Sequence, residues 1–247
     1  MGRVLPILFN SDMVRAILDG RKTVTRRPVR YKYSNTEMEM FTNKYGTRLI
    51  EIQKDIEGES YGRNPDGSTW HKLRAYIEKN PPYRKGDILY VRETFRPLSN
   101  HPKARFEYAA DWSTKYFENS KEPNCCNGGK WIPSIHMPKR AARIWLKVTD
   151  VRVERLQDIT NEQVIKEGIS KETVFRYMRQ SPEPTEEWEQ AAHIIPYSEL
   201  WNSTIKKSDI GFYDWGSNPW VWVIEFERCG KPESEVQNGN IELHNNR

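Results

Sequence analysis

The chain has 247 residues and a formal net charge of +5, from 39 Lys and Arg against 34 Asp and Glu. Its three Cys residues do not make a disulfide framework, and no stretch approaches the roughly 20 apolar residues that a membrane span needs. We therefore expect a cytoplasmic protein without membrane partners, in which the modest basic excess permits nucleic acid as a ligand without requiring it.

The first twenty residues predict a strand followed by a helix. Pro6 to Asn10 is typical of a short buried strand, and Ser11 then offers a hydroxyl to cap the helix. Apolar residues recur at helical spacing on one face of this helix, namely Met13, Val14, Ile17 and Leu18. Gly20 is the expected helix stop.

Two polar segments interrupt the apolar pattern, and we interpret both as insertions. Residues 30–82 are rich in Asn, Gly, Lys, Glu and Tyr, and only 47–53 alternates weakly. Between the insertions, residues 88–95 predict a strand. The second insertion, 97–129, holds an alternating segment at 105–109. We expect the core to be assembled from the segments on either side of these insertions.

The segment after the second insertion predicts a strand and a short helix. Residues 142–156 alternate β-branched and charged side chains, as in a long and bent strand. A helix is expected over 161–166, with Thr160 as its cap and Gly168 as its stop. Glu167 should therefore lie at the end of this helix.

The C-terminal part completes the expected fold. The acidic stretch 181–189 opens a further helix that reaches toward Trp201, and residues 220–227 predict the last strand. Together the elements predict one α+β domain over residues 1–230, as a small barrel or mixed sheet with helices packed outside. The tail 231–247 has no periodic signal, and we expect it to be mobile.

A basic cluster, GRKTVTRR, directly follows the first predicted helix. By itself this cluster suits a solvated basic turn or a phosphate site, since Arg side chains match phosphate oxygens. A Lys crowded by other cations has a lowered pKa, so Lys22 could act as a base, and the Thr25 hydroxyl could attack a carbonyl. Because side chains alternate along a strand, these two can share a pocket only if the chain bends between them.

Other residues give less specific indications. Glu93 lies in a predicted strand and is one of many carboxylates, so the residues alone do not show which carboxylate reaches the basic cluster. His136 stands in the Pro-bounded segment SIHMP, but a lone His more often packs or hydrogen-bonds. Cys125 and Cys126 could be imagined with His136 as metal ligands, yet adjacent cysteines rarely close a tetrahedral site, so we expect no metal.

Several of these segments resemble the ASCH family of PUA-like proteins. The shared motifs are ILDGRKTVTRR at 17–27, KGDIL at 85–89 and VIEF at 223–226. The longer segments PILFNSDMVRAILDGRKTVTRR, YRKGDILYVRETF, WIPSIHMPKRAARIWLKVTDVRVERLQDIT and NPWVWVIEFER resemble the longer ASCH proteins of phages and prophages. The resemblance implies a PUA-like fold of the α+β class, a small mixed β-barrel with flanking helices and two long insertions.

Within this superfamily, the small N4-acetylcytidine amidohydrolases carry a Lys and a Thr in a matching GRKTxTxR motif. The resemblance implies a catalytic triad of Lys22, Thr25 and Glu167 that hydrolyses the exocyclic amide of N4-acylcytidine without a cofactor. In this scheme Lys22 takes the proton of Thr25, whose oxygen attacks the acyl carbon, and Glu167 protonates the departing N4. We expect substrate contacts from six further residues: Arg21, Arg27, Tyr90, Glu93, Trp131 and His136.

Two other functions remain alternatives at this point. Other ASCH and PUA-like proteins are thought to bind or cut RNA, so this chain could be an RNA-binding or RNA-processing module. It could also be a phage accessory protein that acts through protein contacts. For any of the three we expect a monomer.

Overall fold

The computed structural model describes residues 2–32, 36–44, 46–53, 61–63, 65, 69–71, 73–77, 80–98, 105–112, 130–180 and 185–233. The Cys125-Cys126 pair, most of the second insertion and the tail beyond residue 233 lie outside the described residues. No helix of the described part is long and apolar enough to cross a membrane.

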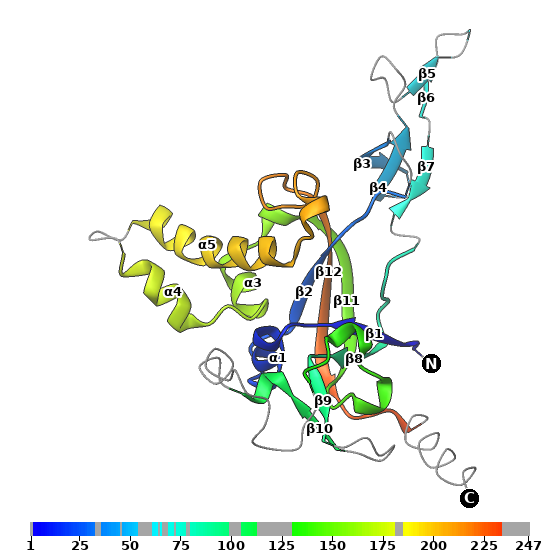
Figure 1. Cartoon of the computed structure of the whole chain (residues 1–247). Coiled ribbons are helices and arrows are strands. Elements are labelled where there is room, and N and C mark those ends of the chain that lie inside the picture. The colour runs from blue at the N-terminus through cyan, green and yellow to red at the C-terminus, as the bar shows by residue number, and fades with distance from the viewer. Residues whose placement is uncertain are drawn as a thin grey trace, which may run out of the picture.

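A five-stranded mixed sheet forms the centre of the molecule (Figure 1). Its strands, in spatial order, are β1 (Val4–Leu8), β8 (Ile88–Arg92), β11 (Trp145–Arg155), β12 (Trp220–Cys229) and β2 (Val24–Pro28). β1 and β8 run parallel, and all other neighbours are antiparallel. The predicted α+β class is confirmed. The expected barrel is not closed, because among the described residues β1 and β2 form the two edges of an open sheet.

The first helix, α1 (Ser11–Leu18), presents its apolar residues to the core as predicted. Its cap differs from the prediction: the side chain of Asn10, and not that of Ser11, accepts from the backbone N–H of Met13 at 2.9 Å. Asn is as good a cap as Ser. β1 ends at Leu8, two residues before the predicted end at Asn10, so Asn10 lies outside the strand and can cap the helix. Gly20 follows the helix with φ +75°, which confirms the predicted stop.

Three helices pack beside the β2 edge of the sheet (Figure 1). They are α3 (Asn161–Lys166), α4 (Lys171–Met178) and α5 (Glu186–Thr204). The predicted cap of α3 is confirmed, and Thr160 and Gln163 form a complete capping box. α4 was not predicted, because its apolar stripe is short. The long strand β11 bends as expected, at a register shift between Val148 and Asp150.

The first insertion forms an arm that projects from the central sheet (Figure 1). It contains a three-stranded sheet and a separate hairpin, whose strands are β3 (Thr36–Asn43), β4 (Gly46–Gln53), β7 (Leu73–Tyr76), β5 (Tyr61–Arg63) and β6 (Thr69–His71). The weak alternation at 47–53 marks β4, the middle strand of the larger sheet. The arm is joined to the core through buried Met38, Leu49 and Ile77.

The predicted strand 88–95 is broken at Glu93. β8 ends at Arg92, and Phe95 begins β9 (Phe95–Pro97), which pairs with β10 (Phe106–Tyr108). At the break, the buried Glu93 carboxylate accepts two hydrogen bonds of 2.9 Å from Arg143. Short 3-10 helices complete the fold at Ala109–Asp111, Ser134–His136, Lys139–Ala141, Leu156–Asp158 and Lys207–Asp209.

Candidate functional site

The chain turns between α1 and β2, and this turn determines where the basic cluster points. The backbone N–H groups of Arg21 and Lys22 both donate to the carbonyl of Ala16, and that of Thr23 donates to the carbonyl of Lys166. β2 begins only at Val24, so Lys22 stands outside the strand. The alternation rule therefore does not apply to Lys22, and the turn over residues 16–22 leads the chain into β2.

The ammonium group of Lys22 is fully buried and donates three hydrogen bonds. Nζ donates to Oε2 of Glu167 at 2.7 Å, to the backbone carbonyl of Glu167 at 2.7 Å and to that of Val24 at 2.9 Å. The exposed side-chain fraction is 0% for Lys22 and 4% for Glu167. Three acceptors match the three donors of an ammonium group, so this geometry fits a charged Lys22 paired with a carboxylate.

Burial lowers the pKa of Lys22 below its ordinary value, and this effect outweighs the opposing charge and hydrogen bond of Glu167. Arg27 and Arg26 lower this pKa further. The direction expected from the sequence is thus found. Its main cause is different, because desolvation contributes more than the neighbouring cations do.

Glu167 owes its position to the end of α3. It is the last residue before Gly168, which has φ +107°. A Cβ at Gly168 would lie 2.9 Å from Cβ of Ala16 and 3.4 Å from Cβ of Lys22. Only glycine allows α1 and the end of α3 to approach this closely, and that approach brings Lys22 to Glu167.

Arg26 occupies the other side of Glu167. Its guanidinium donates to Oε1 of Glu167 at 3.2 Å, to Oε2 of Glu154 at 3.2 Å and to Oε1 of Gln163 at 2.8 Å. We call Lys22, Arg26, Glu154, Gln163 and Glu167 the buried charge cluster. Gln163 serves twice, since the same oxygen also accepts from the N-cap backbone of α3.

Thr25 and Arg27 lie on the opposite face of β2 from Arg26. Arg27 donates to Oγ1 of Thr25 at 3.2 Å, and Thr25 is 1% exposed. Lys22 Nζ lies 5.6 Å and Arg27 Cζ 5.4 Å from the ring centroid of Phe9, so both cations approach one aromatic ring. Of the predicted triad, Lys22 and Glu167 are directly hydrogen-bonded, whereas Thr25 is bonded to Arg27 and, among the described residues, to neither of the other two.

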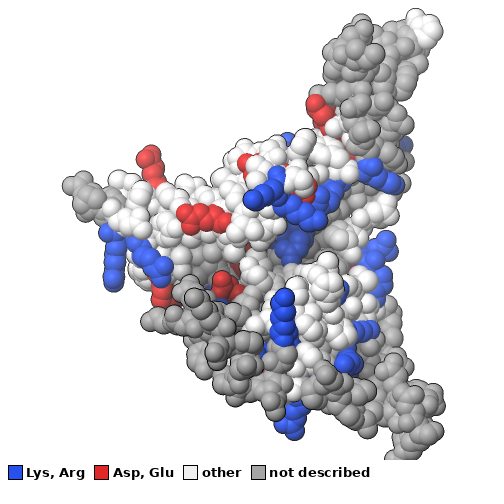
Figure 2. All heavy atoms as spheres, in the orientation of Figure 1, with Lys and Arg blue, Asp and Glu red and all other residues white. Residues whose placement is uncertain are grey.

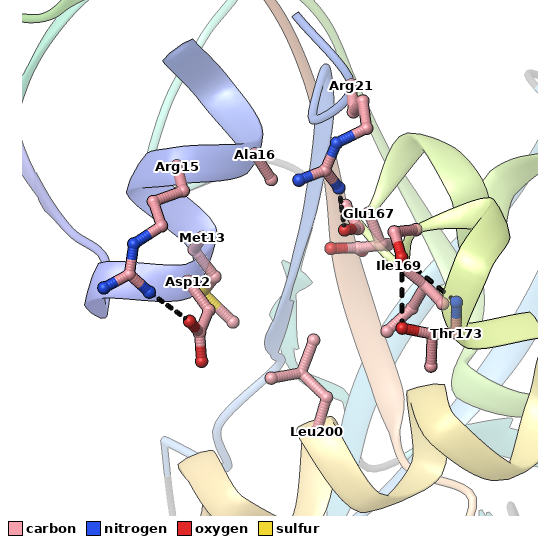
Figure 3. Close-up of a pocket in the computed structure, with 11 residues that line it drawn as sticks. Asp12, Met13, Arg15, Ala16, Arg21, Glu167, Ile169, Thr173 and Leu200 are labelled. Carbon is pink, nitrogen blue, oxygen red and sulfur yellow. Dashed lines mark hydrogen bonds and ion pairs between the residues drawn. The ribbon is translucent and has the colours of Figure 1, made fainter. Parts of the chain in front are cut away.

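Two cavities flank this arrangement. The larger, of about 500 Å³, includes Phe9, Met13, Arg26, Arg27, Tyr83 and Trp201 in its lining. The smaller, of about 290 Å³, lies between α1 and the start of α4 and includes Met13, Arg21, Glu167 and Thr173 (Figure 3). Met13 borders both cavities. Figure 2 shows basic side chains inside and around the hollow at the middle of the face in view.

The other residues predicted to contact substrate are divided between the site and its surroundings. Arg21 lines the smaller cavity and donates to the carbonyl of Gly168 at 2.6 Å. Tyr90 packs against Trp145 with ring centroids 6.0 Å apart, and His136 is exposed. Neither of them lines either of the two cavities.

Glu93 and Trp131 take part in contacts away from the buried charge cluster. Glu93 is held by Arg143, and its pKa is raised mainly by burial. The ring of Trp131 lies 4.6 Å from Cζ of Arg96. Both residues thus stabilise the region of β9 and β10.

Several residues of the site gave no signal in the sequence. Phe9 and Tyr83 appear there as ordinary aromatic residues, and the role of Gln163 was visible only as position N3 of a capping box. Tyr197 lies on α5 with a buried hydroxyl that has no hydrogen-bond partner among the described residues. Burial, followed by the charge of Glu167, raises its pKa well above 10.0.

Within the described ranges, no three His, Cys, Asp or Glu side chains come together as metal ligands. Comparison of the chain with protein-family models, curated proteins and solved structures finds no match.

Proposed function

We propose that this chain is an amidohydrolase that cleaves the exocyclic amide of N4-acetylcytidine and related N4-acylated cytidines. The observation that carries the proposal is the buried Lys22–Glu167 pair: Glu167 lines the smaller cavity, and the neighbouring Arg26 and Arg27 line the larger one. Burying two charges is costly, and buried groups with a perturbed pKa, such as Lys22, concentrate at functional sites. The ASCH resemblance supplies the substrate class, and a PUA-like origin of the fold is part of the same proposal.

The pair can exchange a proton along its 2.7 Å hydrogen bond. Moving that proton from Lys22 to Glu167 leaves a neutral amine and a carboxylic acid, which are a base and an acid side by side. The lowered pKa of Lys22, which is caused mainly by burial, favours this exchange.

In the proposed reaction, the amine of Lys22 accepts the proton of Thr25 while Oγ1 attacks the acyl carbon. The carboxylic acid of Glu167 then donates its proton to N4, and cytidine leaves with an acyl ester remaining on Thr25. Lys22 then passes its proton to Glu167 again, and the neutral amine takes a proton from the water that attacks the ester, while Glu167 returns its proton to Oγ1 of Thr25 as the free acid leaves. The hydrogen bond from Arg27 favours the alkoxide of Thr25, because it donates to the same oxygen.

The substitution Thr25→Val tests this role of the hydroxyl while keeping the shape of the side chain. We expect Thr25→Val to abolish hydrolysis of N4-acetylcytidine, which is followed by its ultraviolet absorbance, and Thr25→Ser to retain part of it. Absence of turnover by the unaltered protein across acetyl, propionyl and benzoyl substrates would refute the proposed function. Full activity of Thr25→Val would refute the role of Thr25.

A further inference from the structure

Arg27 carries a charge that no carboxylate balances directly within the described residues. Its guanidinium donates to three neutral oxygens: Oγ1 of Thr25 and the carbonyls of Arg26 and Leu8. Burial is the main cause that lowers its pKa. Further N–H groups of this guanidinium are left for a ligand.

The lining of the larger cavity is positively charged as a whole. Its lining includes the cations Arg26, Arg27, Arg30 and Lys206 and no Asp or Glu. Arg26 is balanced by the acids of the buried charge cluster, and Arg30 by Asp209 at 2.8 Å. Arg27 and the exposed Lys206 are left without an ion pair in the described structure, so the cavity presents a net positive potential.

We propose that the larger cavity holds the phosphate of a cytidine nucleotide, which Arg27 and Lys206 bind. The inference rests on the proposed function and narrows its substrate from the free nucleoside to a phosphate ester of N4-acylcytidine. Phosphate oxygens accept several charge-assisted hydrogen bonds, which matches a guanidinium and an ammonium group at one cavity. The phosphate belongs either to a mononucleotide or to a nucleotide within RNA.

Size and wall composition of the cavity suit the rest of such a ligand. Its volume of about 500 Å³ lies within the range of small-molecule sites. Tyr83 lines it, is partly buried and is fixed by a 2.9 Å hydrogen bond from its hydroxyl to the carbonyl of Pro6. A fixed aromatic ring of this kind is a surface on which a base can stack. Thr25 does not line this cavity, but Arg27, which lines it, donates to the hydroxyl of Thr25.

Binding of cytidine 5′-monophosphate, cytidine and inorganic phosphate, each measured by calorimetry, tests the subsite without any catalysis. We expect the nucleotide to bind about tenfold more tightly than cytidine, and this advantage to fall as salt is added. Arg27→Gln should remove most of the advantage, and Lys206→Ala part of it. Lys207→Ala is the matched control, because Lys207 is the exposed neighbour that does not line the cavity.

Equal binding of cytidine and its monophosphate would overturn the subsite, as would equal losses in Lys206→Ala and Lys207→Ala. Preference for inorganic phosphate over the nucleotide would also overturn it, because it indicates an anion site without a nucleotide. A short RNA that contains cytidine distinguishes the two sources: tighter binding than the monophosphate identifies RNA, and weaker binding identifies the mononucleotide.

Hydrolysis separates this inference from the proposed function. We expect kcat/KM for N4-acetylcytidine 5′-monophosphate or its RNA form to exceed that for the nucleoside by about tenfold. If no substrate is hydrolysed but the monophosphate binds through Arg27, the proposed function fails and the phosphate site stands. If both substrates are hydrolysed equally and the monophosphate binds no better, the phosphate site fails and the function stands.

Discussion

The ammonium of Lys22 lies 2.7 Å from Oε2 of Glu167, and both side chains are almost entirely excluded from solvent. Seen along the chain, the two residues are 145 positions apart, and the contact joins the end of α1 to the end of α3. The pair is therefore a long-range tertiary contact that stabilises the fold, as well as the proposed acid and base.

Removing one member of the pair should destabilise the fold strongly. Lys22→Met leaves the carboxylate of Glu167 with Arg26 alone, and we expect a loss of about 3–5 kcal/mol in the free energy of unfolding. The double variant Lys22→Met with Glu167→Leu should lose less than the sum of the single losses, because no unpaired charge then remains. Urea unfolding of the four proteins measures this coupling, and strictly additive losses would contradict a direct pair.

Stability should also depend on pH through Lys22. Because burial lowers its folded pKa below 10.5, the unfolded chain binds more protons between that lowered pKa and 10.5. The free energy of unfolding therefore rises with pH between the lowered folded pKa and 10.5. Below the lowered folded pKa, the folded state carries the full cost of burying the charged amine. Lys22→Met lacks this contribution, so the difference between the unaltered protein and Lys22→Met should grow as pH rises through the lowered folded pKa toward 10.5. A constant difference would show that the pKa is not lowered.

Gly168 should tolerate substitution worse than Gly20, although both have positive φ. A Cβ at Gly20 meets nothing within 4 Å, whereas one at Gly168 would overlap Ala16 and press on Lys22. We expect Gly20→Ala to cost about 1–2 kcal/mol from backbone strain alone, and Gly168→Ala to cost more and to reduce hydrolysis. Thermal unfolding with activity assays compares the two, and equal effects would contradict the close approach.

Asp87 of the KGD motif should stabilise the fold in a pH-dependent way. Burial alone would raise its pKa, but hydrogen bonds from the Arg3 side chain and from the backbone N–H groups of Arg84 and Arg3 lower it below 3.8. The stabilisation is complete above 3.8 and is lost as pH falls through the lowered folded pKa. Asp87→Asn should lose roughly 1–3 kcal/mol at pH 7 and show a weaker acid dependence.

The control for Asp87 is Asp19→Asn. Its carboxylate is 57% exposed and forms a surface ion pair with Arg21. Such pairs contribute little, so unfolding at pH 7 should be nearly unchanged in this variant. An equal loss in both variants would indicate a general charge effect and not the buried acceptor at Asp87.

Local signals in the sequence predicted much of the fold. The boundaries of α3, the stop at Gly20 and the bend of β11 follow from caps, glycines and alternation, and all three are confirmed. The cap of α1 was misassigned to Ser11 because two good capping residues, Asn10 and Ser11, are adjacent, and only the backbone conformation selects one. α4 was not predicted, because the apolar pattern of its own residues is short and the helix is stabilised by packing against α5.

The site itself could be predicted only in part. The resemblance placed Lys22 and Glu167 in one site, and they are bonded in the structure. It did not anticipate that Arg26 points away from solvent into the buried charge cluster, because a run of cations is usually solvated. Tyr90, Glu93, Trp131 and His136 were chosen by motif position, which does not encode which face of a strand or turn a side chain takes in the folded chain.

The most direct test of the central claim is kcat/KM for N4-acetylcytidine hydrolysis in the unaltered protein, Lys22→Gln, Glu167→Gln and the double variant. If the two residues act as one acid and base unit, each single variant should lose about as much activity as the double variant, with losses on the order of a thousandfold or more. Hydrolysis that persists in either single variant, or that is absent from the unaltered protein, would contradict the account.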